Sequence, residues 1–153
     1  MSKKEPILVS ACLLGIACRY DGASRPNEIV WSLAKRYRLI PVCPETAGGL
    51  PIPREPSEIV GDRVVSRTGR DVTAEYRRGA ERTLALAQKY GCRAALLKEK
   101  SPSCGTGIVH NGKFDGGLIE GYGITARLLR ENGIAVFGES QTDALIAFLG
   151  DAQ

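Results

Sequence analysis

The chain has 153 residues and a net charge of +4, and 43% of its residues are hydrophobic. This length is enough for one domain with its own core, and the composition indicates neither disorder nor a fibrous repeat. No apolar run approaches the roughly 20 residues that a membrane-spanning helix needs, and the run after Pro6 is too short for a signal peptide. We therefore predict a single cytoplasmic domain over residues 1–153 with no membrane partner. The mild positive charge permits an anionic or nucleic-acid substrate but requires neither.

Short apolar runs alternate with amphipathic segments along the chain, which is typical of an α/β fold. The predicted strands cover Pro6–Ala11, Leu39–Cys43, Arg93–Lys98 and Ile134–Phe137. The predicted helices cover Glu28–Tyr37, a stretch from Asp71 or Thr73 to about Tyr90, Thr125–Glu131 and Thr142–Leu149. This order predicts a single Rossmann-like domain with a mainly parallel four-stranded sheet, helices on both faces and small hairpin insertions.

The remaining segments are predicted from their turn residues. A hairpin over 57–67 should turn at Gly61-Asp62, and a second should turn at Gly112-Lys113, between Ile108-Val109 and Phe114. The segment 44–56 contains four prolines and two glycines, so we expect an irregular loop that builds part of a binding site.

The five cysteines are an odd number in a chain expected in a reducing compartment, which favours ligands, catalysts or core residues over disulfides. Cys12 and Cys104 each come after a predicted strand, and Cys43 ends one. The carboxyl ends of parallel strands meet at one edge of a sheet, so these three thiols should converge there. Cys92 lies between a helix-ending glycine and a strand, and we interpret it as a small core residue.

The cysteine spacing leaves several kinds of site open. Structural zinc sites usually contain close pairs such as C-x-x-C, and this chain has none. His110 adjoins a predicted turn, and we interpret it as an exposed loop residue. A four-iron cluster accepts scattered cysteines, and with only three of them it would keep one iron open as a Lewis acid. The alternatives are a non-catalytic iron–sulfur or sulfur-carrier protein and a structural zinc-binding module.

Five motifs cover nearly the whole chain in order: SACLLGIACRYDG at 10–22, PVCPE at 41–45, GGLPIPR at 48–54, GRDVT at 69–73 and KEKSPSCG at 98–105. Together they resemble the bacterial thiouracil desulfidase family, small iron–sulfur proteins formerly described only as a domain of unknown function. The resemblance implies a [4Fe–4S] cluster bound by three cysteines, and the best matches here are Cys12, Cys43 and Cys104. It also implies catalytic roles for Glu45 and Ser101.

The resemblance further implies the removal of sulfur from a thiolated pyrimidine of the thiouracil or thiouridine type, and we expect this removal to be hydrolytic. The open iron would polarise the carbon–sulfur bond, Glu45 would act as general base on water, and Ser101 would donate to sulfur, polarise the ring or relay a proton. Hydrosulfide and the oxo-pyrimidine would leave with no net redox change. The expected partners are a small thiolated pyrimidine or, alternatively, thiolated tRNA, and the iron–sulfur assembly machinery. The role of Cys18 stays open between a structural thiol and a ligand or sulfur acceptor.

Several other residues are interpreted by type. The charged motif residues are read equally as substrate contacts and as structural ion pairs: Arg19, Asp21, Arg54 and Asp71. Trp31 is read as a core residue. The basic side of the long helix is read as a solvated face formed by Arg77, Arg78 and Arg82.

Overall fold

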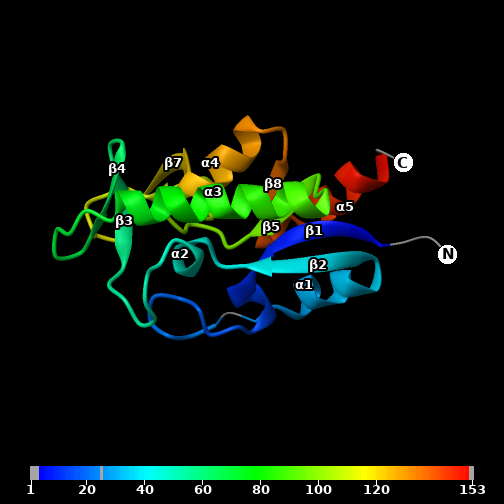
Figure 1. The fold of residues 1–153 in the computed structure, drawn as a ribbon, viewed down its shortest axis with the longest axis horizontal. Coiled ribbons are helices and arrows are strands. Elements are labelled where there is room, and N and C mark those ends of the chain that lie inside the picture. The colour runs from blue at the N-terminus through cyan, green and yellow to red at the C-terminus, as the bar shows by residue number, and fades with distance from the viewer. Residues whose placement is uncertain (1–3, 25, 152–153) are drawn as a thin grey trace.

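A computed structural model describes residues 4–24 and 26–151 and contains a parallel four-stranded sheet at its centre (Figure 1). The strands run in the order β2-β1-β5-β8, with bounds β1 Glu5–Ser10, β2 Tyr37–Val42, β5 Ala94–Leu97 and β8 Ala135–Gly138. Each agrees with a predicted strand to within one or two residues at either end, so the predicted α/β fold is confirmed. Pro41 is tolerated because β2 lies at the edge of the sheet.

Helices cover both faces of the sheet. Successive side chains of β1 point to opposite faces, so the strand contributes to the core on each side. Ile7 and Val9 pack in one core with residues of α1 (Glu28–Ser32) and α5 (Thr142–Asp151). Leu8 packs in a second core with residues of α3 (Thr73–Tyr90) and α4 (Ile124–Glu131). The sheet is therefore buried between two helical layers. No helix in the described ranges is long and apolar enough to cross a membrane.

The first helix is shorter than predicted. The Asn27 side chain caps α1 by accepting from the Val30 amide at 3.1 Å, and the chain continues after Ser32 as a 3-10 turn over Leu33–Lys35. The prediction that Trp31 is a core residue is wrong, because this side chain is 51% exposed. Its indole Nε1 donates to the carbonyl of Leu14 at 3.2 Å.

Two antiparallel hairpins stand apart from the main sheet. The first, β3 Ser57–Val60 with β4 Arg63–Ser66, agrees with the prediction. The second pairs β6 Thr106–His110 with β7 Leu118–Tyr122, so its return strand begins later than predicted. The Asn111 and Asp115 side chains accept from the backbone amides of Lys113 and Gly117, which folds the connection into a compact loop.

The segment after β2 is not wholly irregular, and that part of the prediction is wrong. Pro44–Ala47 forms a single helical turn, α2, with Pro44 at its start, where the missing N–H costs nothing. Arg78 and Arg82 of α3 donate to the carbonyls of Gly48 and Ala47 at 2.9 and 2.5 Å. Arg77, Arg78 and Arg82 are exposed, as the predicted solvated face requires, and two of them also hold the end of α2.

Candidate active site

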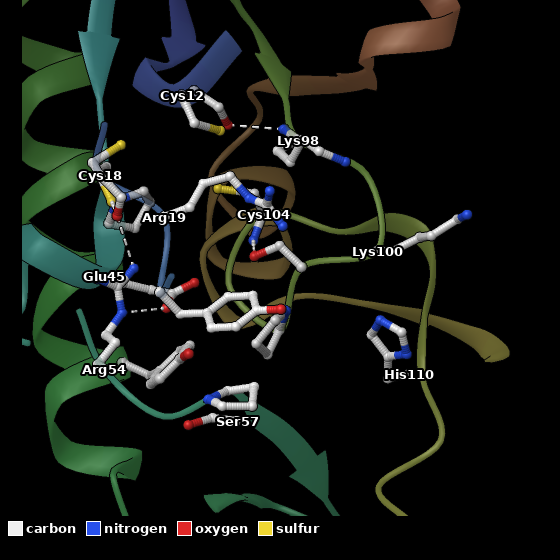
Figure 2. Close-up of a pocket in the computed structure, with 18 of the residues that line it drawn as sticks. Cys12, Cys18, Arg19, Glu45, Arg54, Ser57, Lys98, Lys100, Cys104 and His110 are labelled. Carbon is white, nitrogen blue, oxygen red and sulfur yellow. Dashed lines mark hydrogen bonds and ion pairs between the residues drawn. The ribbon is translucent and has the colours of Figure 1, made fainter. Parts of the chain in front are cut away.

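The three cysteines predicted to converge lie around one cavity. Cys12 lies in the 3-10 turn Ala11–Leu14 directly after β1, Cys43 joins β2 to α2, and Cys104 lies in a turn between β5 and β6. Because β2, β1 and β5 are adjacent and parallel, their carboxyl ends open on the same edge of the sheet. All three residues line a cavity of about 600 Å³ (Figure 2).

A fourth thiol, that of Cys18, lies in the same group. It interacts by hydrogen bonding with the thiols of Cys12 and Cys43, and Cys43 Sγ donates to the Cys18 carbonyl at 3.7 Å. The hydrogen bond with Cys12 and burial raise the pKa of Cys18, and the hydrogen bond with Cys18 together with burial raises the pKa of Cys43. Burial raises the pKa of the Cys104 thiol to about 12. A metal that binds these thiols must displace their protons.

The chemistry of the donors fits an iron–sulfur cluster. Thiolates are soft ligands that select zinc, copper(I) and iron–sulfur clusters. Over the residues that the structure describes, no three His, Cys, Asp or Glu side chains are grouped so as to hold a single metal ion. A four-iron cluster instead takes one thiolate per iron, so its cysteines need only surround a shared space. Cys12, Cys43 and Cys104 surround the cavity in this way.

Glu45 projects from the first turn of α2 into the cavity lining, two residues after Cys43. Its Oε1 accepts a hydrogen bond from Arg54 Nε at 3.0 Å, and the two side chains are only 16% and 6% exposed. Arg54 also donates to the carbonyls of Pro51 and Cys18, each at 3.0 Å. The arginine therefore joins Glu45 to the loop that carries Cys18 (Figure 2).

Tyr76 of α3 extends this polar network at the side of the cavity. Its hydroxyl interacts with the side chains of Glu45 and Ser57. Burial, together with the negative charge of Glu45, raises the pKa of Tyr76 well above its usual range. The tyrosine is therefore a neutral hydrogen-bonding group next to the carboxylate over the whole physiological range.

Ser101 both shapes the turn that carries Cys104 and lines the cavity. Its Oγ accepts from the backbone amides of Ser103 and Cys104, each at 3.0 Å. A hydroxyl has two acceptor lone pairs and one donor hydrogen, so these bonds use its acceptor capacity. What remains for a bound molecule is the Ser101 O–H as a donor.

The prediction for His110 is wrong. It is the last residue of β6, it is half-buried, and it lines the cavity (Figure 2). No local sequence signal marks this position, because the packing of the β6–β7 connection against the distant residue Glu58 brings it there.

Among the charged motif residues, Arg19 and Arg54 line the cavity. Asp71 instead accepts from the Thr73 amide and pairs with Arg63 at 2.6 Å, at the start of α3.

The 2-thiouracil desulfurase family model matches residues 7–141, which is most of the chain. The chain belongs to the 2-thiouracil desulfurase family. The resemblance inferred from the five sequence motifs is therefore confirmed. A curated family relative is the uncharacterised protein YbbK of Bacillus subtilis strain 168, which is 41% identical over 150 residues, or 92% of this chain and 99% of YbbK.

A solved structure gives the same result for the fold. The structure of the [4Fe–4S]-dependent thiouracil desulfidase TudS superposes with a TM-score of 0.91 at 50% identity, covering 96% of this chain and 99% of TudS. The enzyme class and the cofactor named for TudS agree with those that the sequence motifs implied for this member of the 2-thiouracil desulfurase family.

Proposed function

We propose that this protein is a [4Fe–4S]-dependent desulfidase that hydrolyses the carbon–sulfur bond of a thiolated pyrimidine. The observation that carries the proposal is the meeting of three strand-end cysteines around one cavity that Glu45 and Ser101 also line. Membership of the 2-thiouracil desulfurase family and the 50% identity to TudS support the substrate class and the cofactor.

Cys12, Cys43 and Cys104 are the proposed cluster ligands, because they come from three adjacent strand ends and all line the cavity. When bound, the cluster supplies one iron without a protein ligand, which acts as a Lewis acid toward the sulfur of the substrate. In this assignment Cys18 lies next to the ligands and does not itself bind the cluster.

Glu45 is the proposed general base, and it takes a proton from the attacking water. The hydrogen bond from Arg54 to Oε1 and the interaction with the Tyr76 hydroxyl hold the carboxylate at the cavity, where it can accept a proton from water. Ser101 is the proposed donor to the departing sulfur, because its acceptor capacity is already used by two backbone amides. Both side chains transfer only protons, and neither is oxidised or reduced.

The overall reaction is then balanced without a redox partner. The water oxygen forms the new carbonyl bond at the ring carbon, the carbon–sulfur bond breaks, and sulfur leaves as hydrosulfide. We propose a free thiolated base or nucleoside as the substrate and thiolated tRNA as the alternative. We further propose that the protein acts in the cytoplasm, where the iron–sulfur assembly machinery would supply the cluster.

Anaerobic purification followed by metal and turnover assays tests this function. We expect a brown protein with about four irons per chain that releases hydrosulfide from 2-thiouracil or 4-thiouracil, with thiolated tRNA assayed in parallel. The variants E45Q and S101A should keep the iron and lose turnover by about 10²-fold. Stoichiometric zinc would contradict the cluster, and bound iron without turnover on any of the three substrates would favour a carrier protein. Full activity of E45Q or S101A would remove the role of that residue.

A further inference from the structure

Three buried side-chain polar atoms in the described part of the chain have no hydrogen-bond partner: Arg19 Nη1, Thr106 Oγ1 and His110 Nδ1. A buried donor or acceptor without a partner costs free energy, so each such atom in a folded protein calls for an explanation. Arg19 and His110 both line the cavity, whereas Thr106 does not. Arg19 Nη1 already forms an ion pair with Asp21 Oδ2 at 3.7 Å, so His110 Nδ1 is the cavity atom to which a bound molecule would give a partner.

His110 lies on the side of the cavity away from Cys12 and Cys18 (Figure 2). Figure 2 shows the imidazole well apart from Cys12 and Cys18, on the wall formed by the second hairpin. This position therefore suits contact with the pyrimidine ring of a substrate whose sulfur atom faces the cysteines.

A buried carboxylate holds this wall in place. Glu58 of β3 is 8% exposed, and its Oε1 accepts from the backbone amides of Gly112 and Phe114 at 2.9 and 3.2 Å. Charge-assisted bonds of this kind are about twice as strong as neutral ones. The connection that follows His110 is thus fastened to a different hairpin and presents a fixed surface to the cavity.

The backbone of the wall is also unusual. Among the described residues other than glycine, only Lys100 and Phe114 have a left-handed backbone, with φ of 69° and 56°, and both line the cavity. Such conformations are costly for residues with a Cβ and tend to occur at functional sites. Two independent features, the unpartnered imidazole nitrogen and the strained backbone, therefore fall on the same surface.

We propose that the segment His110–Gly116 is the wall that recognises the pyrimidine ring. His110 Nδ1 forms a hydrogen bond with a polar ring atom, and Phe114 contacts the ring. A pyrimidine offers both N–H and C=O groups, and an imidazole nitrogen donates or accepts according to its tautomer, so either pairing is chemically complete. This inference rests on the proposed function, since it names the part of the site that binds the same substrate.

The test measures the binding of uracil, the oxo-pyrimidine product, to the anaerobic holoenzyme by calorimetry. H110F removes the polar nitrogens but keeps an aromatic ring, and we expect it to weaken uracil binding about tenfold with iron content unchanged. H110N keeps a polar group near the position of Nδ1, whereas H110Q places one near Nε2, so H110N should bind uracil more tightly than H110Q. T106V removes the other unpartnered atom of β6, outside the cavity, and should leave binding unchanged.

The chain has a single histidine, so the ¹⁵N signals of its imidazole give a direct second measurement. We expect uracil to shift these signals in the wild-type holoenzyme. The proposal is overturned if uracil fails to bind the wild type, if H110F binds uracil as the wild type does, if H110F loses iron, or if H110Q equals H110N. A wild type that binds uracil in this way but releases no hydrosulfide from any thiopyrimidine would instead contradict the proposed function.

Discussion

Arg54 holds Glu45 and the loop of Cys18 together: its Nε donates to Glu45 Oε1 at 3.0 Å, and its Nη2 donates to the Cys18 carbonyl at 3.0 Å. The side chain is 6% exposed, so water does not compete for these bonds as it does at the surface. A single guanidinium thus sets the position of the proposed base relative to the thiol-bearing loop.

Replacing Arg54 by lysine should impair catalysis without removing iron. A lysine ammonium cannot reproduce the planar fork of donors that reaches Glu45 and Cys18 at once. Misplacing a catalytic group by about 1 Å can cost about 10²-fold in rate, so we expect R54K to lower kcat by about 10- to 100-fold. Steady-state hydrosulfide release and iron content measure the two effects.

The matched control is R70K. Arg70 pairs with Glu75 at 3.7 Å, its side chain is 71% exposed, and it does not line the cavity. R70K should therefore keep the wild-type rate. Wild-type kcat in R54K would show that Arg54 does not position Glu45.

The proposed ligand set predicts one outcome for the ligand cysteines and another for Cys92. C12A, C43A and C104A should each lose most of the iron, because each removes one of three protein bonds to the cluster. C92A should keep it, since Cys92 packs in the core between the sheet and α3. Iron analysis and visible absorption of anaerobically prepared variants measure the outcome.

Cys18 is the informative case in this series, because its thiol interacts with those of Cys12 and Cys43. If only three cysteines bind the cluster, C18A should keep nearly all of the iron. A loss as large as that of C12A would show that Cys18 is a fourth ligand and that no iron is open.

The cysteine arrangement could be predicted from the sequence because it depends on topology alone. A parallel sheet brings successive strand ends to one edge, so the position of Cys12, Cys43 and Cys104 after apolar runs was enough to predict that they meet. The long helix α3 was predictable for a similar reason, since its apolar period and the glycine at its end are local signals.

The rest of the cavity depends on contacts between segments that are distant in sequence. His110 reaches the cavity because Glu58, in another hairpin, holds the connection after it. The turn α2 could not be predicted because Arg78 and Arg82, thirty and thirty-five residues after the carbonyls they bind, satisfy the carbonyls at its end. Neither contact has a signature within the segment that it orders.

The close packing of α2 on α3 also depends on glycine. A Cβ on Gly79 would overlap the carbonyl oxygen of Pro44. Overpacking typically costs about 1–3 kcal/mol, so we expect G79A to reduce the free energy of unfolding by that amount. Because Pro44 lies between Cys43 and Glu45, the shift of α2 should also lower kcat. Chemical denaturation and turnover assays measure the two changes.

G150A is the matched control for G79A. Gly150 also lies in a helix, α5, but a Cβ there would meet nothing within 4 Å. Alanine is favoured over glycine in a helix by about 0.5–1 kcal/mol, so G150A should stabilise the protein slightly and leave turnover unchanged. Equal effects of the two substitutions would show that α2 does not need the close approach at Gly79.

The Cys92 thiol should make stability fall at alkaline pH. Burial, with a smaller contribution from the charge of Glu5, raises the pKa of Cys92 from 9.0 to about 11. Because the pKa of Cys92 is higher in the folded state than in the unfolded state, the protonated thiol contributes its full share of stability below about pH 9. This contribution is lost as the pH rises through about 11. The free energy of unfolding falls with rising pH because the folded state keeps a proton that the unfolded state releases. Denaturation of wild type and C92A between pH 8 and 11 measures it: the stability of the wild type relative to C92A should fall across this range, and a constant difference would contradict the prediction.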